Sequence, residues 1–295
     1  MHLLLLVAAL GLALGVRFLG LVEGVPNQTL SSFWRWSWTL GRFLFPPLLL
    51  LMTALAIVWM HPLANEAGIW NNRISYVISL GFLIGAGGLL GSQVFRAYKT
   101  QGQVRAFPLQ GFDGQTGRLL DSPLPFIAQV GVWQPELVIS QGLLDTLSPV
   151  HLQAVLLHEQ AHRYYRDTFW FFWLGWLKQL TFWLPQTEHL WQELLLLREL
   201  RADRWAANRV DSLLLAEALY LLVSQVGSLS ETFAAGLHNP AFPDRLSQRI
   251  DALLAEPQPW PPVNFSVWGW VALSCLPLAT IPFHSLSHQH YCLML

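Results

Sequence analysis

Two histidines four residues apart, with a glutamate beside the first, form the pattern best suited to chemistry in this sequence: His158, Glu159 and His162. Residues four apart in an α-helix lie on one face, so both imidazoles can bind the same Zn²⁺. The neighbouring glutamate can reach a metal-bound water and act as a general base. Because three fixed positions in five residues also occur by chance, the pattern needs support from the rest of the chain.

The segment that carries this pattern is predicted to be a buried helix over 150–166. Ser148 is typical of an N-cap, and Pro149 is typical of a first helical position. The run at 154–157 is apolar, and buried imidazole and carboxylate groups are costly unless a metal or another partner satisfies them. Burial therefore favours a metal site over a chance match.

A zinc site needs a third protein ligand and one position left for water. Glu199 is the candidate ligand. Asp203 follows four residues later on the same helical face and can accept a hydrogen bond from the far nitrogen of a ligand histidine. The alternative is a surface on which both carboxylates form ion pairs with nearby arginines: Arg198, Arg201 and Arg204. Asp167 is expected to cap its helix or pair with Arg163 rather than bind metal.

The composition indicates a membrane protein. Of 295 residues, 53% are hydrophobic and only 12% are charged, about half the charged share usual in soluble domains. A helix that spans a bilayer needs roughly 20 mostly apolar residues. Four segments are predicted to be transmembrane helices: 3–22, 43–60, 74–95 and 265–283. The net charge of −1 offers no basic surface for nucleic acid, and two cysteines exclude a disulfide framework.

Lysine and arginine gather in the cytoplasmic loops of membrane proteins. The basic residues near the predicted membrane helices fall in two groups that would share one side: Arg17, Arg35 and Arg42, then Arg96, Lys99 and Arg105. The loop between the second and third helices has only Arg73. This distribution predicts a cytoplasmic domain at 96–262, between a membrane domain at 1–95 and a last helix with a short tail at 263–295.

Segment 168–184 is apolar and aromatic, but at about 17 residues it lies at the lower limit for crossing a bilayer. A metal shared by His162 and Glu199 requires both residues on one side of the membrane, so this segment is not a lone span. We expect an interfacial or re-entrant helix there. The rest of the domain is predicted to be α+β, with strands at 103–109, 126–132 and 136–140 and a loop at 111–125. Its helices are predicted to start near 187 and contain 193–207, and to lie at 212–226 and 244–255.

The order and spacing of these motifs resemble those of the integral-membrane zinc peptidases of the β-lactam sensor-transducer type (the BlaR/MecR group) and of the related HtpX/CAAX-prenyl type. The resemblance rests on His158 to His162 followed by Asp167, and on Glu199 to Asp203. Neighbouring segments match as well, namely 125–126, 134–140, 142–144, 147–149 and 240–250. The resemblance implies a mainly α-helical membrane protein with about four transmembrane helices and a cytoplasmic α+β zincin domain of the gluzincin class.

The resemblance also implies one Zn²⁺ per chain, held by three residues: His158, His162 and Glu199. Glu159 would activate the attacking water, and His238 or Arg245 would help to stabilise the oxyanion. The sequence departs from the prenyl-type pattern because Asn239, not a histidine, precedes Pro240. The sensor-transducers carry an extracellular penicillin-binding domain after the last helix. Direct β-lactam sensing is not expected here, because no Ser-x-x-Lys motif is placed to serve it.

The expected function is a membrane-embedded zinc endopeptidase that cleaves a cytoplasmic or juxtamembrane protein in regulated proteolysis or signalling. Its partners would be the lipid bilayer and a protein or peptide substrate, which adds as a strand near 126–132. No signalling partner can be identified from the sequence. One alternative is a catalytically silent membrane signalling or scaffold protein that keeps the zincin fold. Another is an intramembrane-cleaving protease, which is less favoured because Arg163, Arg166 and Asp167 suit a site at the membrane surface.

Overall fold

The computed structural model describes residues 2–22, 32–60, 69–229, 242–255 and 265–282, which are mostly helical. The chain divides into two units: the first comprises 1–93, 174–194 and 260–295, and the second comprises 94–173 and 195–259. The division falls within three helices, namely α3 (Ile69–Arg105), α6 (Asp167–Leu180) and α7 (Thr187–Ala207). Each of these helices therefore contributes residues to both units.

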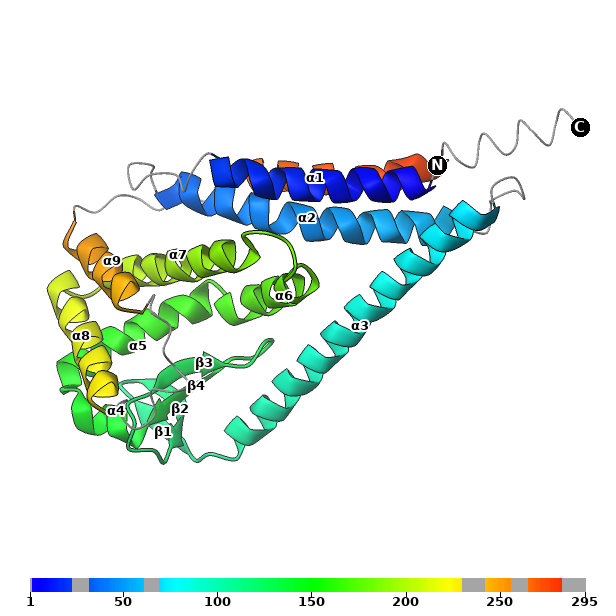
Figure 1. Ribbon diagram of the computed structural model, residues 1–295. Helices are drawn as coiled ribbons and strands as arrows, with labels where there is room; N and C mark the ends of the chain where they lie inside the picture. The colour runs from blue at the N-terminus through cyan, green and yellow to red at the C-terminus, as the bar shows by residue number, and fades with distance from the viewer. Residues whose placement is uncertain (1, 23–31, 61–68, 230–241, 256–264, 283–295) are drawn as a thin grey trace, which may run out of the picture. The chain divides into compact units, whose positions relative to one another are not determined.

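Long apolar helices form the first unit: α1 (His2–Val22), α2 (Ser32–Met60) and α10 (Phe265–Ser274), with a 3₁₀ turn at Leu276–Ala279. α2 packs against both α1 and α10 (Figure 1). Gly41 of α2 makes room for the indole of Trp270, because a Cβ there would lie 2.3 Å from Trp270 Cδ1. Trp38 and Phe45 meet the same indole edge-on.

Two helical segments are long and apolar enough to cross a membrane, namely Trp34–Met60 of α2 and Arg73–Arg105 of α3. The described apolar part of α1 is His2–Phe18, which is shorter. α10 ends at Ser274, before Pro277, and is shorter than the predicted span at 265–283. Within the described residues, two of the four predicted spans therefore meet the length requirement.

The predicted interfacial segment 168–184 contains α6 and the turn that follows it. α6 has 14 residues, and a helix of that length extends about 21 Å. The hydrocarbon core of a bilayer is about 30 Å thick. α6 alone is therefore too short to cross it, as the sequence predicted. Trp170, Phe182 and Trp183 are exposed in this segment.

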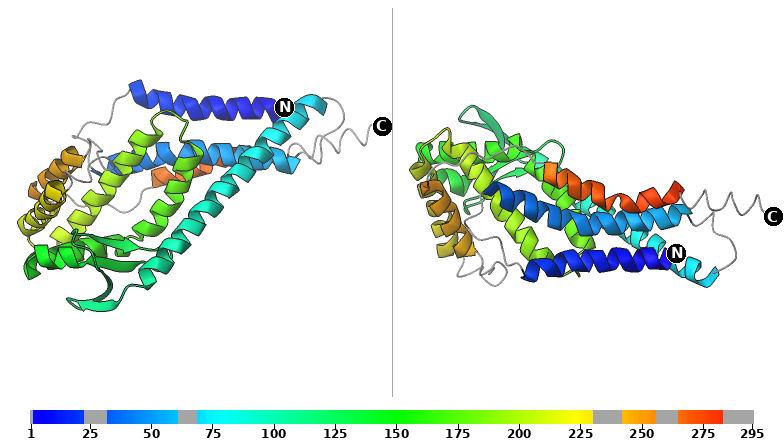
Figure 2. Two further views of the ribbon diagram at one scale, coloured as in Figure 1. Left: turned by 60° about the horizontal axis from the view of Figure 1, so that its bottom comes forward. Right: turned by 90° about the horizontal axis from the view of Figure 1, so that it is seen from above.

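A four-stranded sheet with the order β1-β2-β4-β3 is the centre of the second unit (Figure 2). Its strands are β1 (Leu109–Phe112), β2 (Gln115–Leu120), β3 (Ile127–Val130) and β4 (Glu136–Ser140). β1 and β2 are antiparallel, β2 and β4 are parallel, and β3 runs antiparallel to β4. β3 is thus an edge strand of this sheet.

The structure confirms the strands predicted within 126–132 and at 136–140, and it corrects two other predictions. The strand predicted at 103–109 is wrong, because α3 continues to Arg105. The loop predicted at 111–125 is also wrong, since β1 and β2 form a hairpin there. Asp113 and Gly114 make its two-residue turn with φ of 43° and 79°, the conformation that matches the twist of paired strands. The polar residues and glycines of β2 conceal the apolar alternation that signals a strand.

Helices on one side of the sheet complete the core of the second unit: α4 (Gln141–Thr146), α5 (Pro149–Tyr164), α8 (Ser212–Leu229) and α9 (Phe242–Leu254). α8 packs against α5 and α9 (Figures 1 and 2). Buried side chains from the sheet and three of these helices form one cluster: Phe112, Leu137, Ile139, Leu143, Leu156 and Ala218. α5, which carries the two histidines, is therefore held by the sheet and by α8.

Two serines link the end of β4 to the start of α5. Ser140 Oγ accepts hydrogen bonds from the backbone N–H groups of Phe126 and Leu143, and so ties β3 to the N-terminus of α4. Ser148 caps α5 by accepting from the backbone N–H of His151, and Pro149 follows at the first helical position, as predicted.

Gly142, in the first turn of α4, tests this connection. A Cβ there would lie 2.0 Å from the carbonyl oxygen of Pro123 and 2.4 Å from its carbon, so backbone must move. Gly142→Ala should lower the stability of the second unit by about 1–3 kcal/mol, seen as a lower Tm of the purified full-length protein in detergent. Gly111→Ala is the control, because no atom lies within 4 Å of the added Cβ. Equal melting temperatures for the two variants would contradict this packing argument.

Candidate metal centre

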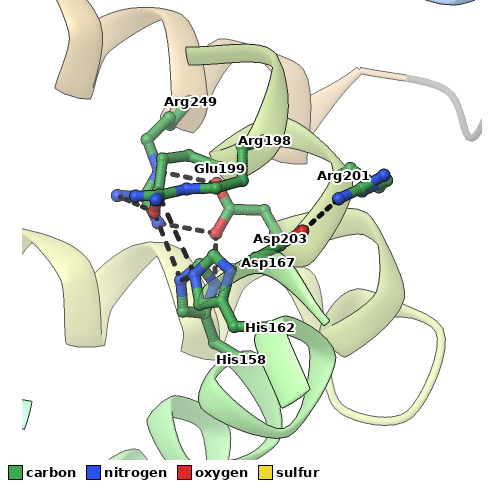
Figure 3. Close-up of polar contacts among 8 residues, drawn as sticks. All are labelled: His158, His162, Asp167, Arg198, Glu199, Arg201, Asp203 and Arg249. Carbon is green, nitrogen blue, oxygen red and sulfur yellow. Dashed lines mark hydrogen bonds and ion pairs between the residues drawn. The ribbon is translucent and has the colours of Figure 1, made fainter. Parts of the chain in front are cut away.

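α5 and α7 bring two histidines and a glutamate together in the second unit (Figure 3). The Nε2 atoms of His158 and His162 lie 3.1 Å apart. Glu199 of α7 places one carboxylate oxygen 3.4 Å from Nε2 of His158 and the other 3.8 Å from Nε2 of His162. Three residues, of which the outer two are 41 positions apart in the chain, therefore bring four potential ligand atoms close together.

These separations suit a single metal ion. Zn–N bonds are about 2.0–2.1 Å long, so two ligand atoms at neighbouring corners of a tetrahedron lie roughly 3.3 Å apart. The observed 3.1, 3.4 and 3.8 Å bracket that value. The imidazole and carboxylate groups of His158, His162 and Glu199 could therefore hold one tetrahedral metal ion and leave a fourth position open.

The opposite nitrogen of each imidazole faces a carboxylate. Nδ1 of His158 lies 2.8 Å from Asp203 Oδ1, and Nδ1 of His162 lies 2.7 Å from Asp167 Oδ2. An ionised carboxylate only accepts hydrogen bonds, so the bond between Asp167 and His162 assigns a ring proton to Nδ1 of His162. The contact between His158 and Asp203 is an ion pair, and the two Nε2 atoms face each other. This is the orientation that carboxylates impose on metal-binding histidines.

The surrounding carboxylates favour positive charge between the two rings. Burial alone would lower the pKa of His158, but Asp203 and Glu199 outweigh it and raise the pKa to about 9. The pKa of His162 is also raised despite its burial, by Asp167 and Glu199. Burial opposes ionisation of Glu199, yet the two histidines and nearby arginines hold its pKa well below the usual range. A proton or a metal ion can supply the charge that this environment favours.

Two arginines complete the surroundings of the acidic residues. Arg249 of α9 forms a two-pronged ion pair with Asp203, with both N–O distances at 2.7 Å, and also lies 3.5 Å from Glu199. Arg198 donates to Glu199 Oε1 at 2.7 and 3.0 Å. Burial disfavours the charge of Arg249, but Asp203, Glu199 and Glu159 outweigh it and raise its pKa. Asp203 and Glu199 therefore each have a cationic partner.

Arg249 was not among the residues selected from the sequence. The sequence pointed to Arg245, which lies one turn earlier on α9 and on the same helical face. The arginine that contacts Asp203 and Glu199 is Arg249. The spacing of four between the two arginines was the only signal that could have identified it. His238, the other residue proposed for the oxyanion, lies outside the described residues.

Asp167 has different partners from those expected. Instead of pairing with Arg163, it contacts Nδ1 of His162 and the guanidinium of Arg201 (Figure 3). The chain turns sharply between α5 and α6, where Arg166 adopts φ of 54°, and this corner returns Asp167 to the ring of His162. The ion-pair face proposed as an alternative for α7 forms only in part, since Arg198 pairs with Glu199 while Arg201 pairs with Asp167.

Glu159 lies beside the two histidines on the buried face of α5. One potential ligand atom from each of His158, Glu159 and His162 lies within 4.8 Å of the others. The exposed fractions of these residues are 5%, 7% and 9%. A carboxylate so close to the open fourth position can exchange a proton with a molecule bound there.

The two carboxylates that orient the rings should control metal affinity. We expect Asp167→Asn and Asp203→Asn each to weaken Zn²⁺ binding about 10- to 100-fold, because the amide holds the Nδ1 proton less firmly than the carboxylate does. Competition against a chelator of known affinity at fixed pH measures this. Asp251→Asn, an exposed residue of α9, is the control. The prediction is contradicted if both variants bind Zn²⁺ as tightly as wild type and if their metal-free forms melt at the wild-type temperature. Neither carboxylate would then act on a bound metal.

Comparison of the chain with models of protein families, with curated proteins and with solved structures finds no match. The functional argument therefore rests on the geometry and chemistry of the centre itself. Its central feature is the convergence of two histidine nitrogens and one carboxylate from α5 and α7.

Proposed function

We propose that this protein is a zinc-dependent membrane endopeptidase of the gluzincin type. The observation that carries the proposal is the spacing of the two Nε2 atoms and the Glu199 carboxylate, at 3.1, 3.4 and 3.8 Å. Imidazole nitrogen and carboxylate oxygen are ligands that Zn²⁺ prefers, and three protein ligands with one open position are typical of catalytic zinc. Glu159 stands beside that position and is the candidate general base.

Each residue of the candidate centre has its own role in the proposed peptide hydrolysis. When bound, Zn²⁺ lowers the pKa of water to about 7 and polarises the scissile carbonyl. Glu159 takes a proton from the attacking water and delivers it to the leaving nitrogen. Asp167 and Asp203 keep both rings oriented through Nδ1. Arg249 holds Asp203 in place and balances the negative charge of Glu199.

The edge of β3 is a suitable site for an extended peptide substrate. β3 pairs only with β4 in the sheet order, and it also contacts α5. Because the carbonyl of Phe126 accepts from the N–H of Ser140, the backbone groups of Ile127 and Gln129 face the open edge. A substrate strand that pairs with these groups would lie beside the helix that carries Glu159.

The proposal includes a multi-pass membrane location with the peptidase domain in the cytoplasm. Its support is the apolar length of α2 and α3, together with the two basic groups of residues that the sequence positions on one side of the predicted spans. In this arrangement α1 and the segment at 265–283 are the other two spans. α6, with its exposed Trp170, is an interfacial helix.

One observation favours a second candidate, a catalytically silent scaffold that keeps the zincin fold. Arg198 and Arg249 both contact the carboxylate of Glu199, and the pair of arginines could keep that carboxylate engaged in a structural ion-pair network. In that case the centre would stabilise the packing of α5, α7 and α9 without turnover. Activity of the purified protein separates the two candidates.

Glu159→Gln should abolish proteolysis while zinc remains at one ion per chain, because general acid–base catalysis contributes at least about 100-fold to the rate and the amide cannot take a proton. The assay follows cleavage of denatured casein and self-cleavage by purified full-length protein, with zinc measured by mass spectrometry. His158→Ala should lose both zinc and activity.

Glu217→Gln makes the same carboxylate-to-amide change at an exposed position and should behave as wild type. Undiminished cleavage by the Glu159→Gln protein would refute its role as the base. The silent scaffold would be favoured by a wild-type protein that binds one zinc ion per chain but cleaves neither these substrates nor the proteins of the cells that express it.

A further inference from the structure

A cavity of about 540 Å³ lies at the corner between α5 and α6, next to the candidate metal centre. Three kinds of residues line it: the aromatic Trp133 and Phe169, the polar Gln134 and Thr168, and the cationic Arg163 and Arg166. All of these residues belong to the second unit. The rings of Trp133 and Phe169 pack against each other with centroids 5.2 Å apart, so the cavity has an apolar side and a charged side.

The two arginines leave this cavity with unbalanced positive charge. Within the described residues, no carboxylate pairs with Arg163 or Arg166. The acidic residues nearest to the lining in the chain are engaged elsewhere, because Glu136 pairs with Arg105 and Arg118, while Asp167 is bound to His162 and Arg201. An anion that enters the cavity therefore meets two exposed arginines among the lining residues, without displacing an existing ion-pair partner.

The corner itself brings the two arginines to one wall. Arg163 lies in the last turn of α5, and the left-handed residue Arg166 begins the change of direction into α6. A left-handed conformation is costly for a residue other than glycine or asparagine, and it persists where surrounding contacts hold it. The backbone carbonyl of Arg166 accepts from the N–H groups of Phe169 and Trp170, which holds this corner. Asp167 consequently faces His162, while its neighbours Arg166 and Thr168 line the cavity.

The position of the cavity relates it to the proposed substrate path. One wall begins at Arg163, the residue after the ligand His162. The other wall is the turn at 132–135, which directly follows the edge strand β3 (Ile127–Val130). An extended peptide advances about 3.3 Å per residue. A chain that pairs with β3 and continues past the end of the strand would therefore reach the turn at 132–135 within a few residues.

We propose that this cavity binds an acidic side chain of the substrate, a few residues from the scissile bond. The inference rests on the proposed peptidase function and names its substrate class: proteins with a Glu or Asp near the cleavage site. A guanidinium group matches a carboxylate through paired hydrogen bonds, and two arginines line the cavity. Trp133 and Phe169 provide the apolar surface for the methylene groups or a neighbouring side chain. A peptide is favoured over a lipid headgroup because the cavity continues directly from the strand edge.

The test is a double variant, Arg163→Gln with Arg166→Asn. Asparagine tolerates the left-handed conformation of position 166, so the double variant should fold, which its Tm checks. Arg209→Gln is the control, because it removes an exposed arginine that packs on Trp205 outside the cavity. Cleavage of a mixed peptide library by each full-length protein gives the residue preference at every position around the scissile bond.

We expect wild type and Arg209→Gln to prefer Glu or Asp at one position, with KM for the matching Gln peptide about tenfold higher or more. The double variant should lose that preference, so that its kcat/KM values for the Glu and the Gln peptide are equal. Arg163→Glu should shift the preference toward Lys at the same position, which a purely structural role for Arg163 would not produce.

A binding measurement separates failure of this inference from failure of the proposed function. Fluorescent extended peptides with a single Glu at successive positions are titrated against Glu159→Gln protein and against the same protein with both arginines replaced. Arginine-dependent binding of one Glu peptide without cleavage by wild type would support the cavity and refute the peptidase. Cleavage without any acidic preference would overturn the cavity assignment alone. Loss of binding to nanodiscs that contain phosphatidylglycerol, with peptide binding unchanged, would also overturn it and identify a lipid site.

Discussion

Two imidazole nitrogens lie 3.1 Å apart, and the carboxylates around them favour positive charge on or between the two rings. Helical spacing alone does not create this situation, because side chains one turn apart can adopt rotamers that separate their rings. Asp203 and Asp167 remove that freedom by contacting the opposite nitrogens of His158 and His162. Glu199 then adds a carboxylate to the same point. The side chains that surround the two rings come from α5, α6, α7 and α9, and together they favour positive charge at this point.

Burial of so many charged groups is possible because they alternate in sign. One chain of contacts runs from Arg249 through Asp203 to His158, and another runs from Arg201 through Asp167 to His162. An isolated buried carboxylate would be neutralised or hydrated, whereas a paired and hydrogen-bonded one remains charged. The alternation also makes the centre cooperative, because each member loses a partner when its neighbour is removed.

The corner between α5 and α6 serves two sites at once. Its left-handed residue, Arg166, separates Asp167, which contacts His162, from Thr168, which lines the neighbouring cavity. The same backbone turn thus orients a candidate metal ligand and shapes the proposed substrate subsite. A change that relaxes this turn would affect both sites, which gives the unusual conformation a physical reason to persist.

Much of the local structure follows from the sequence. Apolar runs and cap residues predicted α5, α7, α8 and α9, and the strands at 126–132 and 136–140 were recognisable from their composition. The hairpin of β1 and β2 was not, because its strands contain glycines and polar residues in place of an apolar alternation. The length of α2 and α3 was underestimated, since segments that contain polar and charged residues continue the apolar segments as single helices.

The sequence by itself determined that His158, Glu159 and His162 share one helical face, because the 3.6-residue period relates neighbours without reference to the rest of the molecule. The spacing of Glu199 and Asp203 likewise puts them together on another helix. Only the tertiary structure decided that these two faces meet, that Arg249 rather than Arg245 contacts them, and that Asp167 turns back to His162. Those outcomes depend on contacts between helices distant in the chain and on one left-handed residue, and no local periodicity encodes either.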